Sequence, residues 1–155
     1  MKIFLIVPSL LTSQLWAATQ TSNFTVTATV NANCTIVTNN LDFGNYLGAQ
    51  IDASTTMTIN CTNGTPYTVA LNIGTGSGAT YANRILTSGA STMNYNLFTD
   101  TVRTTVWGDG TSSSQLNNGT GSGTNQTLTV YGRLPGSQTP TSGTYTDTVT
   151  ATVTY

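Results

Sequence analysis

Apolar and polar residues alternate with a period of two in several short segments of this chain. In residues 24–30 the apolar positions are separated by threonines; they are Phe24, Val26, Ala28 and Val30. Such alternation predicts a β-strand with one apolar face and one polar face. The hexapeptide Thr-Val-Thr-Ala-Thr-Val of residues 25–30 recurs at residues 148–153. The sequence therefore predicts similar strands near its beginning and near its end.

Further alternating segments follow along the chain, separated by turn signals such as Asn63-Gly64. They span residues 34–37, 55–61, 67–73, 93–97, 102–106, 128–134 and 144–155. In the last of these segments the inward-facing residues are expected to be Tyr145, Val149, Ala151, Val153 and Tyr155. No segment of useful length has the 3.6-residue period of a helix. Many short strands joined by turns predict an all-β sandwich.

Charge is scarce in this sequence. Only 6% of the residues are charged, histidine is absent, and the formal net charge is −1. Binding to nucleic acid is therefore not expected, because it requires a basic face. The abundance of Thr, Gly, Asn and Ser is typical of an extracellular β-protein.

The first residues resemble a secretory signal. Lys2 precedes an apolar run, and cleavage is expected after Ala17. The run is far shorter than the roughly 20 residues that a membrane-spanning helix needs. We therefore expect an exported protein that is not embedded in a membrane.

Cys34 and Cys61 are the only cysteines, and both share the parity of the apolar residues around them. In an exported chain, two cysteines predict one disulfide. Two thiols without histidine offer too few ligands for a metal site. No cofactor site is expected either, because the glycine-rich segments lack a following helix and a lysine.

Enzymatic activity is not expected, because without histidine no base is available for a serine or cysteine nucleophile. Carboxylates for a hydrolytic pair exist, but a structural role is favoured for them; they are Asp42, Asp52, Asp100, Asp109 and Asp147. Alternation places Asp147 on the inward face, at the rim or paired with Arg84, Arg103 or Arg133. Trp107 beside Asp109 fits either a plain hairpin or stacking on a sugar.

The uncharged segment at residues 21–30 has two interpretations. Its threonines and its lack of charge do nothing to protect a sheet edge. It can therefore pair with an exposed edge of another molecule, where main-chain hydrogen bonds give affinity and alternate side chains fill pockets. Equally, it can be the first strand of its own domain.

Several pieces of the sequence, in this order, resemble the spore coat protein U domain family, which includes subunits of archaic, Csu-type chaperone–usher pili. These pieces are Asn33-Cys34-Thr35-Ile36, residues 41–46 (LDFGNY), residues 60–67 (NCTNGTPY), residues 95–100 (YNLFTD), residues 103–110 (RTTVWGDG) and residues 143–149 (GTYTDTV). The resemblance covers nearly the whole chain after residue 17.

The resemblance implies an incomplete immunoglobulin-like β-sandwich that is completed by donor-strand exchange. Residues 1–17 would be a signal peptide, residues 18–30 the donor strand, and residues 31–155 the sandwich domain. The donor strand would present Phe24, Val26, Ala28 and Val30. The acceptor groove would be lined by Ile36, Val149, Ala151, Val153 and Tyr155. The Cys34–Cys61 disulfide would join the first strand to its neighbour.

The function implied is that of a secreted structural pilus subunit that supports adhesion and biofilm growth. Its partners would be a periplasmic chaperone, an outer-membrane usher and identical or homologous subunits, and it would reach the cell surface through the periplasm. Two alternatives remain open: a structural protein of a spore or cell coat, and a carbohydrate-binding adhesin module.

Overall fold

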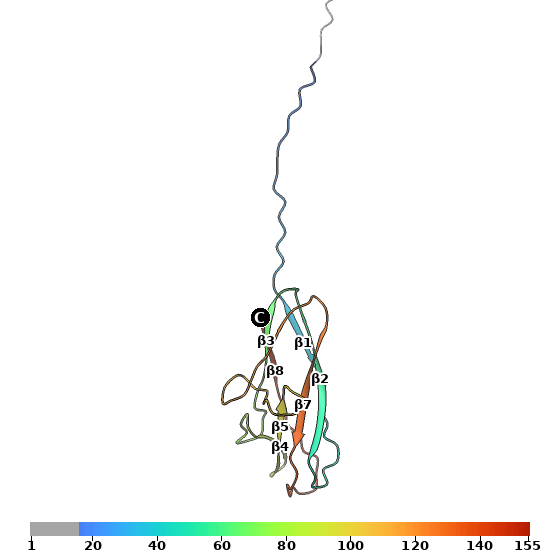
Figure 1. Ribbon diagram of the computed structural model, residues 1–155, viewed down its shortest axis with the longest axis vertical. Coiled ribbons are helices and arrows are strands. Elements are labelled where there is room, and N and C mark those ends of the chain that lie inside the picture. Colours follow the sequence, from blue (N-terminus) through green and yellow to red (C-terminus); the bar gives the residue numbers. More distant parts are fainter. Residues whose placement is uncertain (1–15) are drawn as a thin grey trace, which may run out of the picture.

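The computed structural model describes residues 16–155. The strands of this part of the chain form two antiparallel sheets (Figure 1). The larger sheet has the order β1-β2-β7-β5-β4, and the smaller has the order β6-β3-β8. The strands are β1 (Cys34–Thr38), β2 (Ile51–Cys61), β3 (Pro66–Leu71), β4 (Arg84–Ser88), β5 (Ser91–Phe98), β6 (Asn117–Thr120), β7 (Gln126–Leu134) and β8 (Ala151–Thr154). The predicted signal peptide, residues 1–17, lies outside the described residues except for its last two.

The core lies between the two sheets and follows the predicted alternation. Its buried side chains include Met57 and Ile59 of β2, Tyr67, Val69 and Leu71 of β3, and Met93, Tyr95 and Leu97 of β5. Because side chains of a strand alternate between its faces, each of these strands contributes every second residue to the core. Burial of this apolar surface is the main favourable contribution to folding.

Trp107 is a core residue rather than a surface platform. Its side chain is 0% exposed, and its indole Nε1 donates a hydrogen bond of 2.9 Å to the carbonyl of Val69. The interpretation of Trp107 as a sugar-stacking residue is therefore wrong. A buried indole needs a partner for its N–H group, and Val69 supplies it.

The expected strand at residues 102–106 does not form. The Asp100 carboxylate instead accepts hydrogen bonds from the backbone N–H groups of Thr104 and Thr105, which fold the segment into a loop. Arg103 has a φ of 60°, and its Nε donates to the carbonyl of Gly132. Val102 consequently stays exposed. Side-chain capping by Asp100 has replaced the strand ladder.

The last strand is shorter than expected. Residues 144–150 do not continue β8, which begins only at Ala151. Thr146 instead forms an isolated bridge to Thr87 of β4, while Ala151–Thr154 pair with β3 in the other sheet. The segment before β8 therefore crosses from one sheet to the other along the edge of the sandwich.

The predicted disulfide between Cys34 and Cys61 is confirmed. The two cysteines lie directly opposite each other in the register of β1 and β2, and the Cys61 side chain belongs to the buried core. This bond fixes the beginning of β1, an edge strand of five residues, to the end of the long central strand β2.

No helix among residues 16–155 is long and apolar enough to cross a membrane.

Replacing both cysteines by alanine should lower the free energy of unfolding by about 3–4 kcal/mol, because the closed loop restricts the unfolded chain. The two residues are 27 positions apart in the sequence. Urea unfolding of the variant and of the wild-type protein measures the difference. Wild-type protein unfolded in a reducing agent is the matched control and should behave like the variant; an unchanged midpoint in both would contradict the prediction.

Candidate functional site: a groove and an unpaired strand

A groove of about 1410 Å³ runs along the open edge of the sandwich. Residues 38–47, which follow β1, form one wall. Residues 140–149 and Ala151, which lead into β8, form the other. Both walls are largely irregular segments of the chain, so their main-chain groups are not committed to a regular sheet.

The floor of the groove is the apolar core itself. It is formed by residues of β2, β3, β4, β5 and β7: Met57, Leu71, Leu86, Met93, Tyr95, Leu97, Val130 and Leu134. Leu41, Phe43 and Tyr46 from the first wall pack half-buried against this core. The ring of Phe43 meets that of Tyr95 edge to face, with centroids 6.1 Å apart. The groove is thus apolar below and polar at its rims.

The two walls are tied together at the end where β2 begins. The backbone N–H of Gln138 donates to the hydroxyl of Tyr46 at 2.8 Å, and the N–H of Ser137 donates to the carbonyl of Gly48 at 2.8 Å. Towards the other end, β1 and β8 contact each other. Each of these strands is the last in its sheet, with one edge paired and the other free. Free edges of this kind are templates for a further strand.

Asp147 is the one carboxylate that organises the second wall. It accepts hydrogen bonds from the Tyr95 hydroxyl at 2.6 Å, from the N–H and hydroxyl of Thr75 at 2.7 and 2.8 Å, and from its neighbour Thr148. Gly74, with a φ of 89°, permits this approach, since a Cβ there would collide with the carboxylate. Of the two alternatives for Asp147, pairing with an arginine is not observed within residues 16–155: hydroxyl and N–H donors hold it instead.

Burial alone would raise the pKa of Asp147, but the hydrogen bonds from Tyr95 and Thr75 outweigh it and bring the pKa below its usual value. Burial and the bond to Asp147 together raise the pKa of Tyr95 well above its ordinary range. The pair is therefore a carboxylate and a neutral phenol at neutral pH, and it anchors the wall to the floor of the groove.

Arg84 of β4 is a buried cation, with a side chain that is 0% exposed. Its guanidinium donates to the carbonyl of Asn72 at 3.0 Å, to the carbonyl of Trp107 at 2.7 Å and to the amide oxygen of Asn96 at 2.8 Å. Burial lowers its pKa. Carbonyl dipoles thus satisfy this buried cation.

The acceptor residues expected from the sequence are distributed along this edge. Val149 and Ala151 line the groove. Ile36 and Val153 are half-buried against the core nearer the junction of β1 and β8. Tyr155 lies beyond β8 and is 55% exposed.

Sequence reasoning missed the first wall and most of the floor. The apolar positions Leu41, Phe43 and Tyr46 were visible, but nothing in their spacing indicates which side of the sandwich they cover. The residues of the floor were expected to belong to the core. They line a groove because no strand within residues 16–155 lies over them. One feature of the sequence did point to the site: alternation places Asp147, a charged residue, on the inward face of its segment, where apolar residues are expected.

Residues 16–33 form an extended segment that belongs to neither sheet and projects away from the sandwich (Figure 1). The side chains of Phe24, Val26 and Val30 are 86%, 81% and 82% exposed, and Ala28 is exposed as well. This segment departs from the start of β1, at the same end of the sandwich as the C-terminus (Figure 1). An uncovered apolar stripe of this kind marks an interaction surface.

The remaining carboxylates serve local structure. Asp52 forms an ion pair with Arg133, with Nε and Oδ1 2.8 Å apart, and lies 3.6 Å from Arg103; these contacts lower its pKa. Asp109 accepts from the N–H and hydroxyl of Thr111 within a turn. Within residues 16–155 no three His, Cys, Asp or Glu side chains come together in a way that would hold a metal ion.

Comparison with known proteins gives consistent results. Residues 20–152 match the family model described as Spore Coat Protein U domain. The chain is 34% identical over 159 residues to "Protein U" of Myxococcus xanthus, an alignment that covers 90% of this chain and 87% of that protein.

The fold is similar to that of a chain in the crystal structure of the CsuC–CsuE chaperone–tip adhesion subunit pre-assembly complex, from the archaic chaperone–usher Csu pili of Acinetobacter baumannii. The TM-score is 0.61 and the sequence identity 26%. The match covers 82% of this chain and 40% of that chain, so the chain spans about two fifths of its structural relative. The likeness confirms the all-β, immunoglobulin-like fold class.

Replacing Asp147 by asparagine should destabilise the protein at neutral pH and have a smaller effect in acid. The depressed pKa of Asp147 stabilises the fold above the carboxylate's unfolded pKa of about 3.9, and this contribution is lost as the pH falls through the lower folded value. Urea unfolding of both proteins at pH 7 and at about pH 2 measures it. Tyr95→Phe, which removes one donor, should reduce the same pH dependence in part. An Asp147→Asn effect of equal size at both pH values would contradict this account.

Proposed function

Since the chain belongs to the spore coat protein U domain family, we propose that it is a structural subunit of a surface fibre assembled by a chaperone–usher pathway. In this proposal the extended segment of residues 18–30 is a donor strand, and the groove beside Val149 and Ala151 accepts the corresponding strand of the next subunit. The observation that carries the proposal is the coexistence, in one chain, of an uncovered apolar strand and an uncovered apolar groove.

The chemistry of the two surfaces is complementary. The donor strand presents Phe24, Val26, Ala28 and Val30 on one face and threonines on the other, and none of these residues is charged. The groove has an apolar floor of Leu71, Leu86 and Met93 among others, flanked by wall segments and by the free edges of β1 and β8. A strand inserted there can hydrogen-bond along its main chain and place every second side chain on the floor.

The expected strength of such a link suits a fibre. If the four apolar side chains of the donor strand bury about 300 Å² of apolar surface in total, area alone contributes about 7 kcal/mol before the costs of association. Main-chain pairing adds to this. Each link is non-covalent, yet its dissociation would be very slow.

The proposed partners rest on the likeness to chaperone–usher pilus subunits, and the exposed surfaces are compatible with them. An uncovered groove and strand would aggregate during export, so a periplasmic chaperone would occupy the groove first, and an outer-membrane usher would exchange it for the strand of an identical or homologous subunit. The similar Csu structure is a complex of a chaperone with a tip adhesion subunit, which supports this assignment. The subunit would pass through the periplasm to the cell surface and support adhesion and biofilm growth there.

A structural role in a spore or cell coat is the second candidate, and the description of the matching family model, Spore Coat Protein U domain, favours it. It requires the same fold and differs in the assembly partner. Genes for a chaperone and an usher beside the gene for this chain would favour the fibre, and their absence would favour the coat. The carbohydrate-binding alternative relied on Trp107 as the residue that stacks on a sugar, and Trp107 is buried and therefore not accessible to one.

Deleting residues 19–30 should abolish donation while leaving the groove intact. The shortened protein should still bind its chaperone and accept a synthetic peptide of residues 18–30, but it should not extend a fibre. Denaturing gels run without heating measure this, because strand-exchanged polymers persist as ladders that collapse on boiling. Normal ladders from the deletion variant would refute the proposal.

A charge placed on the apolar face of the donor strand should act like the deletion. Val26→Asp puts a carboxylate against the apolar floor, where its burial is costly, and should reduce ladder formation by at least tenfold. Thr27→Asp is the matched control, since it adds the same charge to the neighbouring residue on the opposite face. Equal effects of the two substitutions would show that charge, rather than the apolar face, controls assembly.

A further inference from the structure

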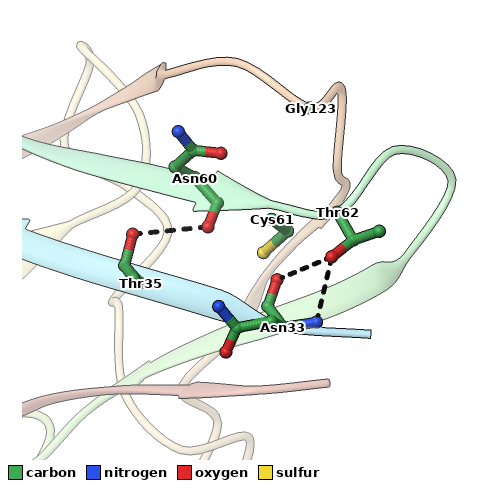
Figure 2. A pocket seen from close by; sticks show the side chains of 6 residues that line it. All are labelled: Asn33, Thr35, Asn60, Cys61, Thr62 and Gly123. Carbon is green, nitrogen blue, oxygen red and sulfur yellow. Dashed lines mark hydrogen bonds between the residues drawn. The ribbon is translucent and has the colours of Figure 1, made fainter. Parts of the chain in front are cut away.

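The extended segment does not leave the domain freely. At its base, the hydroxyl of Thr62 accepts a hydrogen bond of 3.1 Å from the backbone N–H of Asn33. The same hydroxyl lies 3.3 Å from the carbonyl of Asn31 and 3.4 Å from that of Asn33, and its single proton can serve one of them at a time. Figure 2 shows the contacts between Thr62 and Asn33. One side chain therefore contacts the backbone of both Asn31 and Asn33.

Backbone hydrogen bonds hold Thr62 itself in position. Its N–H donates to the carbonyl of Asn33 at 2.9 Å, and its carbonyl accepts from Thr65 at 3.0 Å. The turn that begins at Thr62 is held to the neighbouring loop by bonds from Gly64 N–H to the Gly121 carbonyl and from Gly121 N–H to the Thr65 carbonyl, at 2.8 and 2.7 Å. A Cβ on Gly121 would collide with the Thr62 carbonyl, so the loop needs glycine there. The disulfide at the adjacent Cys61 completes this support.

The sequence of residues 31–33 is compatible with a second path for the segment. Asn-Ala-Asn at residues 31–33 separates two strand-like sequences, and a three-residue connection rich in asparagine is compatible with a β-hairpin. A reversal at this point would lay residues 24–30 antiparallel to β1, along the free edge that β1 presents beside the groove. The chain would then cover its own acceptor edge and lose its donor strand.

We infer that Thr62 is a positioning residue that holds the strand outward and so directs it to a second copy of this chain rather than to its own groove. This inference rests on the proposed function. Thr62 touches neither the groove nor the residues of the donor strand. Its hydroxyl acts only on the backbone of Asn31 and Asn33, the residues whose conformation decides between the outward and the folded-back path.

Thr62→Val tests the inference, since it keeps the shape of the side chain and removes the hydroxyl. Thr35→Val is the matched control: it removes a hydroxyl from the same strand pair, one that bonds to the Asn60 carbonyl at 3.4 Å and not to residues 31–33 (Figure 2). Loss of the clamp should shift the ratio of outward to folded-back chains about tenfold, which corresponds to about 1.4 kcal/mol.

Two measurements on the full chain after signal removal report that shift. In dilute monomer, the backbone amides of residues 24–30 should exchange their hydrogens more slowly in Thr62→Val than in the wild-type protein and in Thr35→Val, which gives them partial protection. On concentration, Thr62→Val should form heat-sensitive ladders more slowly than the other two, by the same factor as the outward fraction of the chains falls.

The outcomes separate the two proposals. Unprotected amides in Thr62→Val, or ladders at the wild-type rate, would overturn the role of Thr62. A lower thermal midpoint with slow ladders but without protection would reveal only a structural role and would also overturn it. Absence of ladders from the wild-type protein would refute donor-strand exchange, while the amide measurement would still test the clamp.

Discussion

The architecture depends on a sheet edge that the chain does not cover by itself. In a sandwich, the apolar floor between the sheets must be closed along both sides, and main-chain groups at the edges need partners. Here the segments that would close one side, residues 38–47 and 140–149, part from each other and leave Leu71, Met93 and other core residues at the bottom of a groove. The irregular walls border this opening, and the proposed pairing with another subunit depends on it.

Polar contacts inside the groove compensate for the missing cover. An apolar wall without a neighbour would collapse onto the floor or fray into solvent, and either would remove the groove. Asp147 prevents this by joining the second wall to Tyr95 in β5 and to Thr75 beyond β3. The buried Arg84 in turn donates hydrogen bonds to the carbonyls of Asn72 and Trp107. These groups are expensive to bury, and each is hydrogen-bonded. They hold the shape of the groove that, in the proposed assembly, accepts the strand of another subunit.

The sequence predicted the fold better than it predicted the site. The alternation of Tyr67, Val69 and Leu71, and of Met93, Tyr95 and Leu97, predicted strands whose inward residues are indeed buried, and the two cysteines predicted their own bond. The same rule failed at Val102, because the Asp100 carboxylate accepts hydrogen bonds from the backbone that follows and folds it into a loop. It also failed at residues 144–150, where the chain passes from one sheet to the other. Alternation describes which face a side chain occupies, but it contains no information on whether a neighbouring element covers that face. The groove is such an absence, and only the paths of residues 38–47 and 140–149 reveal it.

The disulfide at the base of the extended segment has a mechanical consequence. Tension on a fibre of such subunits would enter each domain at residue 33 and reach Cys34 first. Because Cys34 is bonded to Cys61, the load passes at once into β2, which pairs with β1 on one side and with β7 on the other. The five-residue edge strand is thereby relieved of shear that would otherwise peel it from the sheet. A single covalent bond at the point of attachment lets the long pair of β2 and β7, rather than the five-residue edge strand β1, resist pulling.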